Sequence, residues 1–183
     1  MPEYRRPWVP GATYFITIVT HDRHERFRDD TVVALWRAAL VQAMKLKPFK
    51  VIAGVALPDH VHLIVELPPG VVDLSSRIGL AKALFTKSVK APRSVSPSRH
   101  KHREADIWQR RFFDHLIRDD DDFIAHMDYL HYNPVKHGHV KCPKDWPWSS
   151  FHHWVTQGAY PTNWCCSNHE RPDFKSIEDT VGE

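Results

Sequence analysis

The sequence predicts an α+β domain in which a four-stranded antiparallel sheet carries two helices on one face, with a third helix and an aromatic C-terminal tail added. Segments rich in β-branched and aromatic residues alternate with segments of helical periodicity in the order strand, helix, strand, strand, helix, strand. That order is typical of the ferredoxin-like split βαβ arrangement, in which the first and third strands lie at the centre of the sheet. The composition, with 42% hydrophobic and 26% charged residues, is that of a globular protein.

The first strand and the first helix follow from local patterns. Residues 13–20 are dense in β-branched and aromatic side chains, which predicts a strand. Asp30 or Thr31 can cap a helix that runs to about Leu46, because apolar residues recur along this segment at helical spacing.

A predicted hairpin carries two closely spaced histidines. Residues 50–57 predict the second strand, and the Pro58-Asp59 pair predicts a tight turn into the third. In the third strand His60 and His62 share one face, because successive side chains of a strand point to opposite sides. The alternate residues are apolar and can anchor the strand in the core: Val61, Leu63 and Val65. Two imidazoles at this spacing can bind one metal ion, but in a chain with 14 histidines they can also be two ordinary surface residues.

The second helix begins at Asp73 or Ser75 and fades near residues 91–92. The segment 90–103 then holds five Lys or Arg and two His residues but no acidic residue, and prolines and serines interrupt it. It is either a mobile basic loop that grips phosphates or a merely solvated linker. Residues 107–118 return to a strand-like composition and predict the fourth strand.

Four acidic residues, Asp119 to Asp122, mark the start of the third helix, because carboxylates there bind free N–H groups and oppose the helix dipole favourably. The helix should run from about Asp121 to Asn133, since Pro134 disfavours helical backbone in the residue before it. A tail rich in Trp and Pro follows Gly138. Most of it should pack on the domain, whereas the last dozen residues should be loose.

The third helix presents a polar flank beside its core-facing stripe. Helical spacing puts three residues in that stripe: Phe123, Met127 and Leu130. His126, Tyr129 and Asn133 lie together along one flank, from which Tyr129 and Asn133 could approach the two histidines of the third strand. Tyr132 should point toward solvent. An isolated tyrosine on such a flank can equally be a half-buried packing residue.

Charge and composition restrict the class of protein. A formal charge of +3 is only a weak argument for a polyanionic partner. No apolar run approaches the roughly 20 residues that span a bilayer, and the N-terminus lacks a signal-peptide core. Three cysteines form no CxxC pair and no obvious disulfide framework. We therefore expect a cytosolic protein with reduced thiols and no membrane partner.

Several motifs together resemble one family. They are LPDHVH (residues 57–62), WQRRF (108–112) followed by Asp114-His115, and DYLHYNPVKHG (128–138). Their joint pattern is similar to the IS200-type single-tyrosine HUH transposases and most resembles the REP-associated tyrosine transposases. The opening EYRR (3–6) and the tail DWPWSSF (145–151) are similar too, so the resemblance covers nearly the whole chain.

The resemblance implies a catalytic domain over residues 1–140 and a packed tail over 141–183. His60 and His62 would be the metal-binding pair, Tyr129 the nucleophile and Asn133 a third ligand, where IS200-type relatives often have Gln. Tyr132 is a second candidate for the nucleophile. The implied cofactor is Mg²⁺ or Mn²⁺. The implied activity is DNA transposition: cleavage and joining of single-stranded hairpin DNA through a 5′-phosphotyrosine link, by a cytoplasmic, nucleoid-associated bacterial enzyme.

Other residues could support this activity. Cations that could grip DNA phosphates lie in the N-terminal arm and the basic segment: Arg5, Arg6, Lys90, Arg93, Arg99, Lys101 and Arg103. His115 and His126 could contact and orient the metal-binding residues without binding the metal themselves. His126 could help to ionise the tyrosine, or could be a solvated surface residue. We expect a monomer in which Tyr129 serves the histidines of its own chain.

Two other functions are compatible with the same fold. One is a hairpin-binding module that does not cut DNA, and the other is a metal-dependent hydrolase or RNA-binding protein. The joint presence of two histidines, a tyrosine and an asparagine favours the enzyme, because neither binding nor hydrolysis needs all four.

Overall fold

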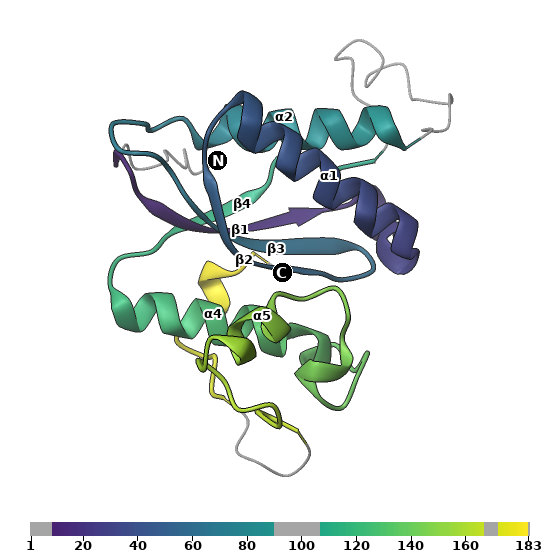
Figure 1. Ribbon diagram of the computed structural model, residues 1–183, viewed down its shortest axis with the longest axis vertical. Helices are drawn as coiled ribbons and strands as arrows, with labels where there is room; N and C mark the ends of the chain where they lie inside the picture. Colours follow the sequence, from purple (N-terminus) through teal and green to yellow (C-terminus); the bar gives the residue numbers. More distant parts are fainter. Residues whose placement is uncertain (1–8, 90–106, 167–171, 183) are drawn as a thin grey trace.

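The computed structural model describes residues 9–89, 107–166 and 172–182. Figure 1 shows one sheet between two layers of helices. The main elements in chain order are β1 (Thr13–Val19), α1 (Asp30–Leu46), β2 (Lys50–Ala56), β3 (His60–Glu66), α2 (Leu74–Ser88), β4 (Phe113–Leu116), α4 (Asp120–Lys136) and α5 (Phe151–Thr156). The strands are all antiparallel and lie in the order β2-β3-β1-β4, so the predicted split βαβ arrangement is confirmed, with β1 and β3 at the centre.

The two faces of the sheet carry different helices. Alternation along the strands sends one set of side chains under α1 and α2, including Tyr14, Ile16, Val61 and Leu63. The opposite set, which includes Phe15 and Ile64, packs against α4 and the C-terminal tail. In Figure 1, α1 and α2 accordingly lie above the sheet, while α4 and α5 lie below it. The predicted placement of the first two helices on one face is confirmed.

Carboxylate side chains cap the helix starts as expected, but the capping residue of α1 differs from the predicted one. The side chain of Asp29, rather than Asp30 or Thr31, caps α1 by accepting a hydrogen bond from the Thr31 N–H. Asp73 caps α2 through the Ser76 N–H, as predicted. The Asp119 carboxylate caps α4, and the other three acidic residues occupy its first turn.

Two element ends differ from the sequence prediction. Helix α4 does not stop at Asn133 but continues through Pro134 to Lys136, and the His137 N–H donates to the Asn133 carbonyl. The fourth strand is shorter than predicted: Trp108 pairs with Thr20 only as an isolated bridge, and a bend at residues 110–111 separates it from β4. The Trp108 ring packs against Trp36 and Phe85 in the core beneath α1 and α2.

The tail covers both an edge and a face of the sheet. Backbone hydrogen bonds join Ala56 to Trp148 and Ser150 to Gly54, so residues 148–150 protect the edge strand β2. The sequence predicts residues 172–182 to be loose, but two of them, Ile177 and Val181, are buried in the core between the sheet and α4. The division of the chain at residue 140 stays a prediction.

Cys142 and Cys166 form a disulfide, and Cys165 is the free cysteine of the described residues. The expectation of three reduced thiols is therefore wrong for two of them. The pair is separated by 24 residues and meets only because the tail folds back on itself. None of the helices in the described ranges is both long and apolar enough to cross a bilayer.

Candidate active site

The two histidines of β3 lie on the sheet face that α4 covers. Their ring centroids are 4.8 Å apart. The His60 side chain is 2% exposed and His62 is fully buried, so the interpretation as ordinary surface residues is wrong. Val61, Leu63 and Val65 point into the opposite core, as the strand alternation predicts.

Thr17 fixes the tautomer of His62. The Thr17 hydroxyl donates its only hydrogen to the backbone carbonyl of Val181, and Oγ1 lies 2.9 Å from Nδ1 of His62. Oγ1 must therefore accept a hydrogen bond from a protonated Nδ1. The lone pair of a neutral His62 then belongs to Nε2.

Asp59 does the same for His60. Burial opposes ionisation of Asp59, but its hydrogen bond to His60 and the charges of His60 and Arg23 outweigh burial and hold its pKa well below the ordinary value. Nδ1 of His60 lies 2.6 Å from Oδ1 of this carboxylate, and Arg23 binds Oδ2 at 2.9 Å. A carboxylate accepts from Nδ1–H, so the lone pair of a neutral His60 is also on Nε2.

Helix α4 brings Tyr129 to these histidines. Tyr129 is fully buried, and its ring centroid lies 5.7 Å from that of His62 and 6.1 Å from that of Phe15. Asn133 follows one helical turn later and is also fully buried. The predicted approach of Tyr129 to the histidine strand is therefore observed.

Tyr132 does not point toward solvent as predicted. It is 7% exposed and packs against two aromatic rings of the tail, Trp164 and Phe174. The prediction was wrong because helical spacing identifies the face opposite the sheet, whereas the tail supplies a second layer over that face.

His60, His62 and Asn133 carry the types of donor atom that fit a divalent cation. Two neutral imidazoles offer Nε2 lone pairs, and Asn133 offers an amide oxygen. Nitrogen and oxygen donors of this kind suit Mn²⁺ or Mg²⁺.

A second polar cluster lies beside this site, between β4 and the start of α4. Ligand atoms of His115, Asp122 and His126 lie within 4.8 Å of one another and could hold a metal ion. Asp122 also binds Arg118 through Nε, at 3.1 Å. Burial opposes ionisation of Asp122, but hydrogen bonds from Arg118 and His115 lower its pKa to about 2.

His126 is fully buried in this cluster, so its interpretation as a solvated residue is wrong. Its ring stacks on His115 with centroids 4.5 Å apart, and its nitrogens contact the Asp122 carbonyl and the Thr180 hydroxyl of the tail. Burial lowers the pKa of His126. These contacts tie α4 to β4 and to the tail. His126 is separated from His62 by Phe15, whose ring contacts both.

The tail covers the nucleophile candidate. The Phe174 ring stands edge-on to Tyr129, with centroids 5.3 Å apart. Because Tyr129 has no exposed surface, the side chains that cover it must move before a phosphate can reach its oxygen.

Sequence analysis missed three residues that contact the site: Thr17, Asp59 as the partner of His60, and Lys136, whose Nζ donates to the Tyr129 hydroxyl at 2.7 Å. The alternation of β1 could have placed Thr17 on the correct face, but the strand pairing that puts it opposite His62 is a tertiary feature. The seven cations predicted to grip DNA, from Arg5 to Arg103, lie outside the described residues.

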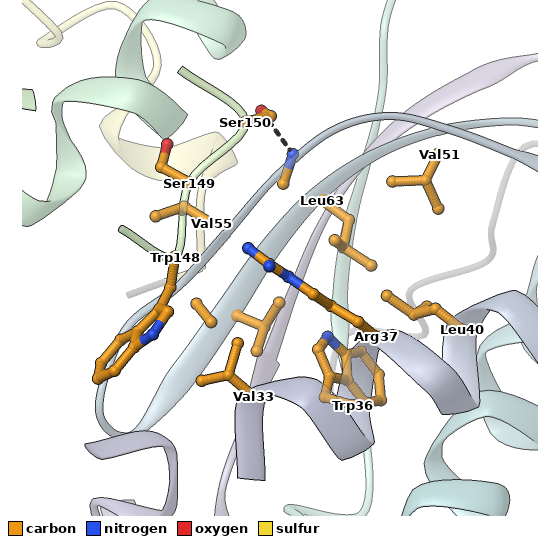
Figure 2. Close-up of a pocket in the computed structure, with 13 residues that line it drawn as sticks. Val33, Trp36, Arg37, Leu40, Val51, Val55, Leu63, Trp148, Ser149 and Ser150 are labelled. Atoms are coloured by element: carbon orange, nitrogen blue, oxygen red, sulfur yellow. Dashed lines mark hydrogen bonds between the residues drawn. The ribbon is translucent and has the colours of Figure 1, made fainter. Parts of the chain in front are cut away.

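A separate hollow of about 180 Å³ lies on the opposite side of the sheet, between α1, the edge strand β2 and residues 148–150. Figure 2 shows the Arg37 side chain extending from α1 across it, with Trp36 and Trp148 on its walls. Space remains because Gly54 has no side chain; a Cβ there would come within 2.8 Å of Leu63. This hollow shares no lining residue with the histidine and tyrosine site.

Comparisons with known proteins show the family of this chain. The family model described as "Transposase IS200 like" matches residues 9–133. The REP-associated tyrosine transposase of Escherichia coli K12 is 39% identical over 164 residues, which are 90% of this chain and 91% of that protein. A Haemophilus influenzae protein, provisionally named a REP-associated tyrosine transposase, is 45% identical over 165 residues. The match covers 90% of this chain and 93% of that protein.

A solved structure of a REP-associated tyrosine transposase bound to a REP hairpin has the same fold. Its TM-score is 0.78 at 37% sequence identity, and the match covers 100% of this chain and 98% of that one. The chain therefore belongs to the IS200-like transposase family and, within it, to the REP-associated tyrosine transposases, a group of DNA-processing enzymes.

Proposed function

We propose that the protein cuts and rejoins single-stranded hairpin DNA through a covalent bond between Tyr129 and a DNA 5′-phosphate. The observation that carries this proposal is the meeting of Tyr129 and His62 on one face of the sheet, with ring centroids 5.7 Å apart, beside a second histidine whose lone pair is also on Nε2. Neither DNA binding nor simple hydrolysis requires a tyrosine next to two such imidazoles.

His60, His62 and Asn133 are the residues that would hold Mg²⁺ or Mn²⁺. A bound divalent cation supplies neutralisation of the phosphodiester charge and polarisation of phosphorus. Asp59 and Thr17 keep the two imidazoles in the tautomer that such a cation needs.

Tyr129 is the residue that reacts. Its oxygen attacks phosphorus in line, so that a Tyr129 O–P bond forms and the P–O3′ bond breaks. The phenolic proton passes to water, and the departing O3′ takes up a proton to become a free 3′-hydroxyl. Because the phosphoester is conserved on the enzyme, a second 3′-hydroxyl can reverse the attack and join two strands without ATP.

The substrate proposal rests on the relatives. The solved structure that matches this chain holds a REP hairpin. The cations of the N-terminal arm and of the segment 90–103 are the residues we expect to bind phosphates here. An enzyme of this kind would act in the bacterial cytoplasm, at the nucleoid.

We further propose that one chain forms one complete site. His60 and His62 of β3 and Tyr129 of α4 lie together within a single chain, which supports a monomer acting in cis.

A covalent-adduct assay tests the proposal. The protein is incubated with Mn²⁺ and single-stranded hairpin DNA that is labelled at its 3′ end in one reaction and at its 5′ end in another. A 5′-phosphotyrosine link predicts that only the 3′-labelled DNA moves with the protein on a denaturing gel. Tyr129→Phe should abolish the adduct, and Tyr132→Phe, the matched control, should keep it.

The full burial of Tyr129 favours one alternative, a module that binds hairpins without cutting. Hairpin binding without any adduct, in a preparation that retains Mn²⁺, would support that alternative and refute the enzymatic proposal.

A further inference from the structure

We propose that Lys136 is a second catalytic residue, whose ammonium group holds the reacting oxygen of Tyr129 and stabilises the negative charge that develops on it. This inference rests on the proposed function, in which Tyr129 is the nucleophile.

The contact between the two side chains is direct. Nζ of Lys136 donates a hydrogen bond to the Tyr129 hydroxyl at 2.7 Å, and the same nitrogen lies 4.7 Å from the centre of the tyrosine ring. The Tyr129 ring is fully buried, whereas Lys136 is exposed, so the ammonium group reaches the phenol oxygen from the solvent side of the site.

The course of α4 explains why these residues meet. They are separated by seven residues, which is close to two turns at about 3.6 residues per turn. Helical side chains lean toward the N-terminus, so Lys136 leans back along the same face toward Tyr129. This requires the helix to continue through Pro134 to Lys136, as it does. A helix that ended at Asn133 would not fix Lys136 on this face.

A simpler explanation is that Lys136 is an ordinary cation at a helix C-terminus. Lysines are common there because they interact favourably with the helix dipole and with the last carbonyl groups. That explanation accounts for the residue type but not for the direction of the side chain, which reaches the one hydroxyl that is proposed to react.

The same oxygen changes role between the two half-reactions. In cleavage it forms the bond to phosphorus as the P–O3′ bond breaks. In joining it leaves phosphorus as a phenolate while a new O3′–P bond forms and the proton of the attacking 3′-hydroxyl passes to water. Charge on this oxygen is intermediate in the transition state of both steps. A cationic donor positioned beforehand stabilises such charge more than it stabilises a neutral phenol. Loss of Lys136 should therefore slow both cleavage and joining.

The test measures single-turnover rates at saturating hairpin DNA and Mn²⁺. We expect Lys136→Met to slow adduct formation about 10²-fold, the effect of removing one preorganised donor. Joining should slow by a similar factor, because the same transition state is crossed in reverse. Lys136→Arg should keep part of the rate, since it keeps a cationic donor.

Lys45→Met is the matched control. Lys45 also lies in the last turn of a helix and is exposed, but it belongs to α1 on the other side of the sheet. Its rates should equal those of the wild type. Hairpin affinity should be the same in both variants if Lys136 acts on Tyr129 rather than on the DNA backbone.

Chemical rescue separates a missing donor from a damaged structure. In Lys136→Ala, added propylammonium should restore part of the cleavage rate, because it can place an N–H donor where the lysine was. Tetramethylammonium at the same ionic strength has the charge but no N–H, and should restore none.

The outcomes distinguish this inference from the proposed function. Near wild-type rates in Lys136→Met, with Tyr129→Phe inactive, would overturn the role of Lys136 and leave the function standing. A Lys136→Met defect confined to DNA affinity would overturn it as well. Adduct formation by Tyr129→Phe would instead refute the function on which the inference rests.

Discussion

Thr17 of β1 and His62 of β3 are directly opposed residues of neighbouring antiparallel strands, and their side chains are joined by a 2.9 Å contact between Oγ1 and Nδ1. The Thr17 hydroxyl also binds the Val181 carbonyl, so a single buried side chain connects a proposed metal ligand to the C-terminal tail. The orientation of His62 therefore depends on the pairing of two strands and on the position of the C-terminal tail. Thr17 and Val181, which make the second contact, are 164 residues apart in the sequence.

Thr17→Val should weaken metal binding and lower stability. The substitution keeps the shape of the side chain but leaves Nδ1–H of a buried histidine without its acceptor, which costs about 1–3 kcal/mol. It also frees the tautomer of His62, and loss of such a partner typically lowers metal affinity about 10- to 100-fold. Calorimetric Mn²⁺ titration and urea unfolding measure the two effects. Thr13→Val, on the same strand but away from His62, should change neither; equal behaviour of the two variants would contradict the role of Thr17.

His60→Ala and His62→Ala should each abolish cleavage while leaving most hairpin binding, because phosphate contacts outside the site supply the affinity. Asn133→Ala should be milder, since water can replace a neutral ligand. Adduct yield and hairpin affinity are measured side by side. A histidine variant that cleaves at nearly the wild-type rate with added Mn²⁺ would show that the metal assignment is wrong.

His131 should make stability depend on pH. It is fully buried, and burial lowers its pKa to about 3, whereas an unfolded histidine has a pKa of about 6.5. Between these values the unfolded chain binds the proton and the folded protein does not. The contribution of neutral His131 is complete above about pH 6.5 and is lost as pH falls toward 3.

His131→Gln should therefore flatten the pH dependence of the unfolding free energy between pH 6 and 4, where one such group contributes at most about 1.4 kcal/mol per pH unit. Urea unfolding at several pH values measures the slope. His152→Gln, at an exposed histidine, serves as the control and should leave the slope unchanged. A slope in His131→Gln as steep as that of the control would mean that other groups cause the pH dependence.

Phe174→Ala should expose Tyr129 and speed cleavage, because the Phe174 ring covers the tyrosine in the folded protein. Nitration of Tyr129, located by mass spectrometry, reports its exposure, and adduct formation reports the rate. Phe112→Ala removes a half-buried aromatic ring from the opposite core and should affect neither. Unchanged nitration in Phe174→Ala would indicate that other parts of the tail keep the site closed.

Mixing two inactive variants tests whether sites are shared. If each chain forms its own site, Tyr129→Phe and His60→Ala remain inactive together. Recovery of cleavage in the mixture, at any ratio, would show that one chain supplies the tyrosine to another, and the monomer proposal would fall.

The sequence by itself determined the features that depend on near neighbours in the chain. Alternation along β3 put His60 and His62 on one face and Val61 on the other, because a strand has a side-chain period of two. Carboxylates before α2 and α4 capped those helices, since their free N–H groups need acceptors within a few residues. The order of strands and helices was sufficient for the split βαβ topology, because few arrangements bury the apolar faces of such elements.

Only the tertiary structure decided the features that depend on distant segments. Helix periodicity placed Tyr132 opposite the sheet, but Trp164 and Phe174 bury it there. The preference of residues before proline against helical backbone is local, and the buried packing of Asn133 and Pro134 overrides it, which carries α4 on to Lys136. Strand pairing brought Thr17 to His62, and the returning tail brought Val181 to Thr17. Contacts of this kind have no periodic signature, because they are made between surfaces that exist only after the chain has folded.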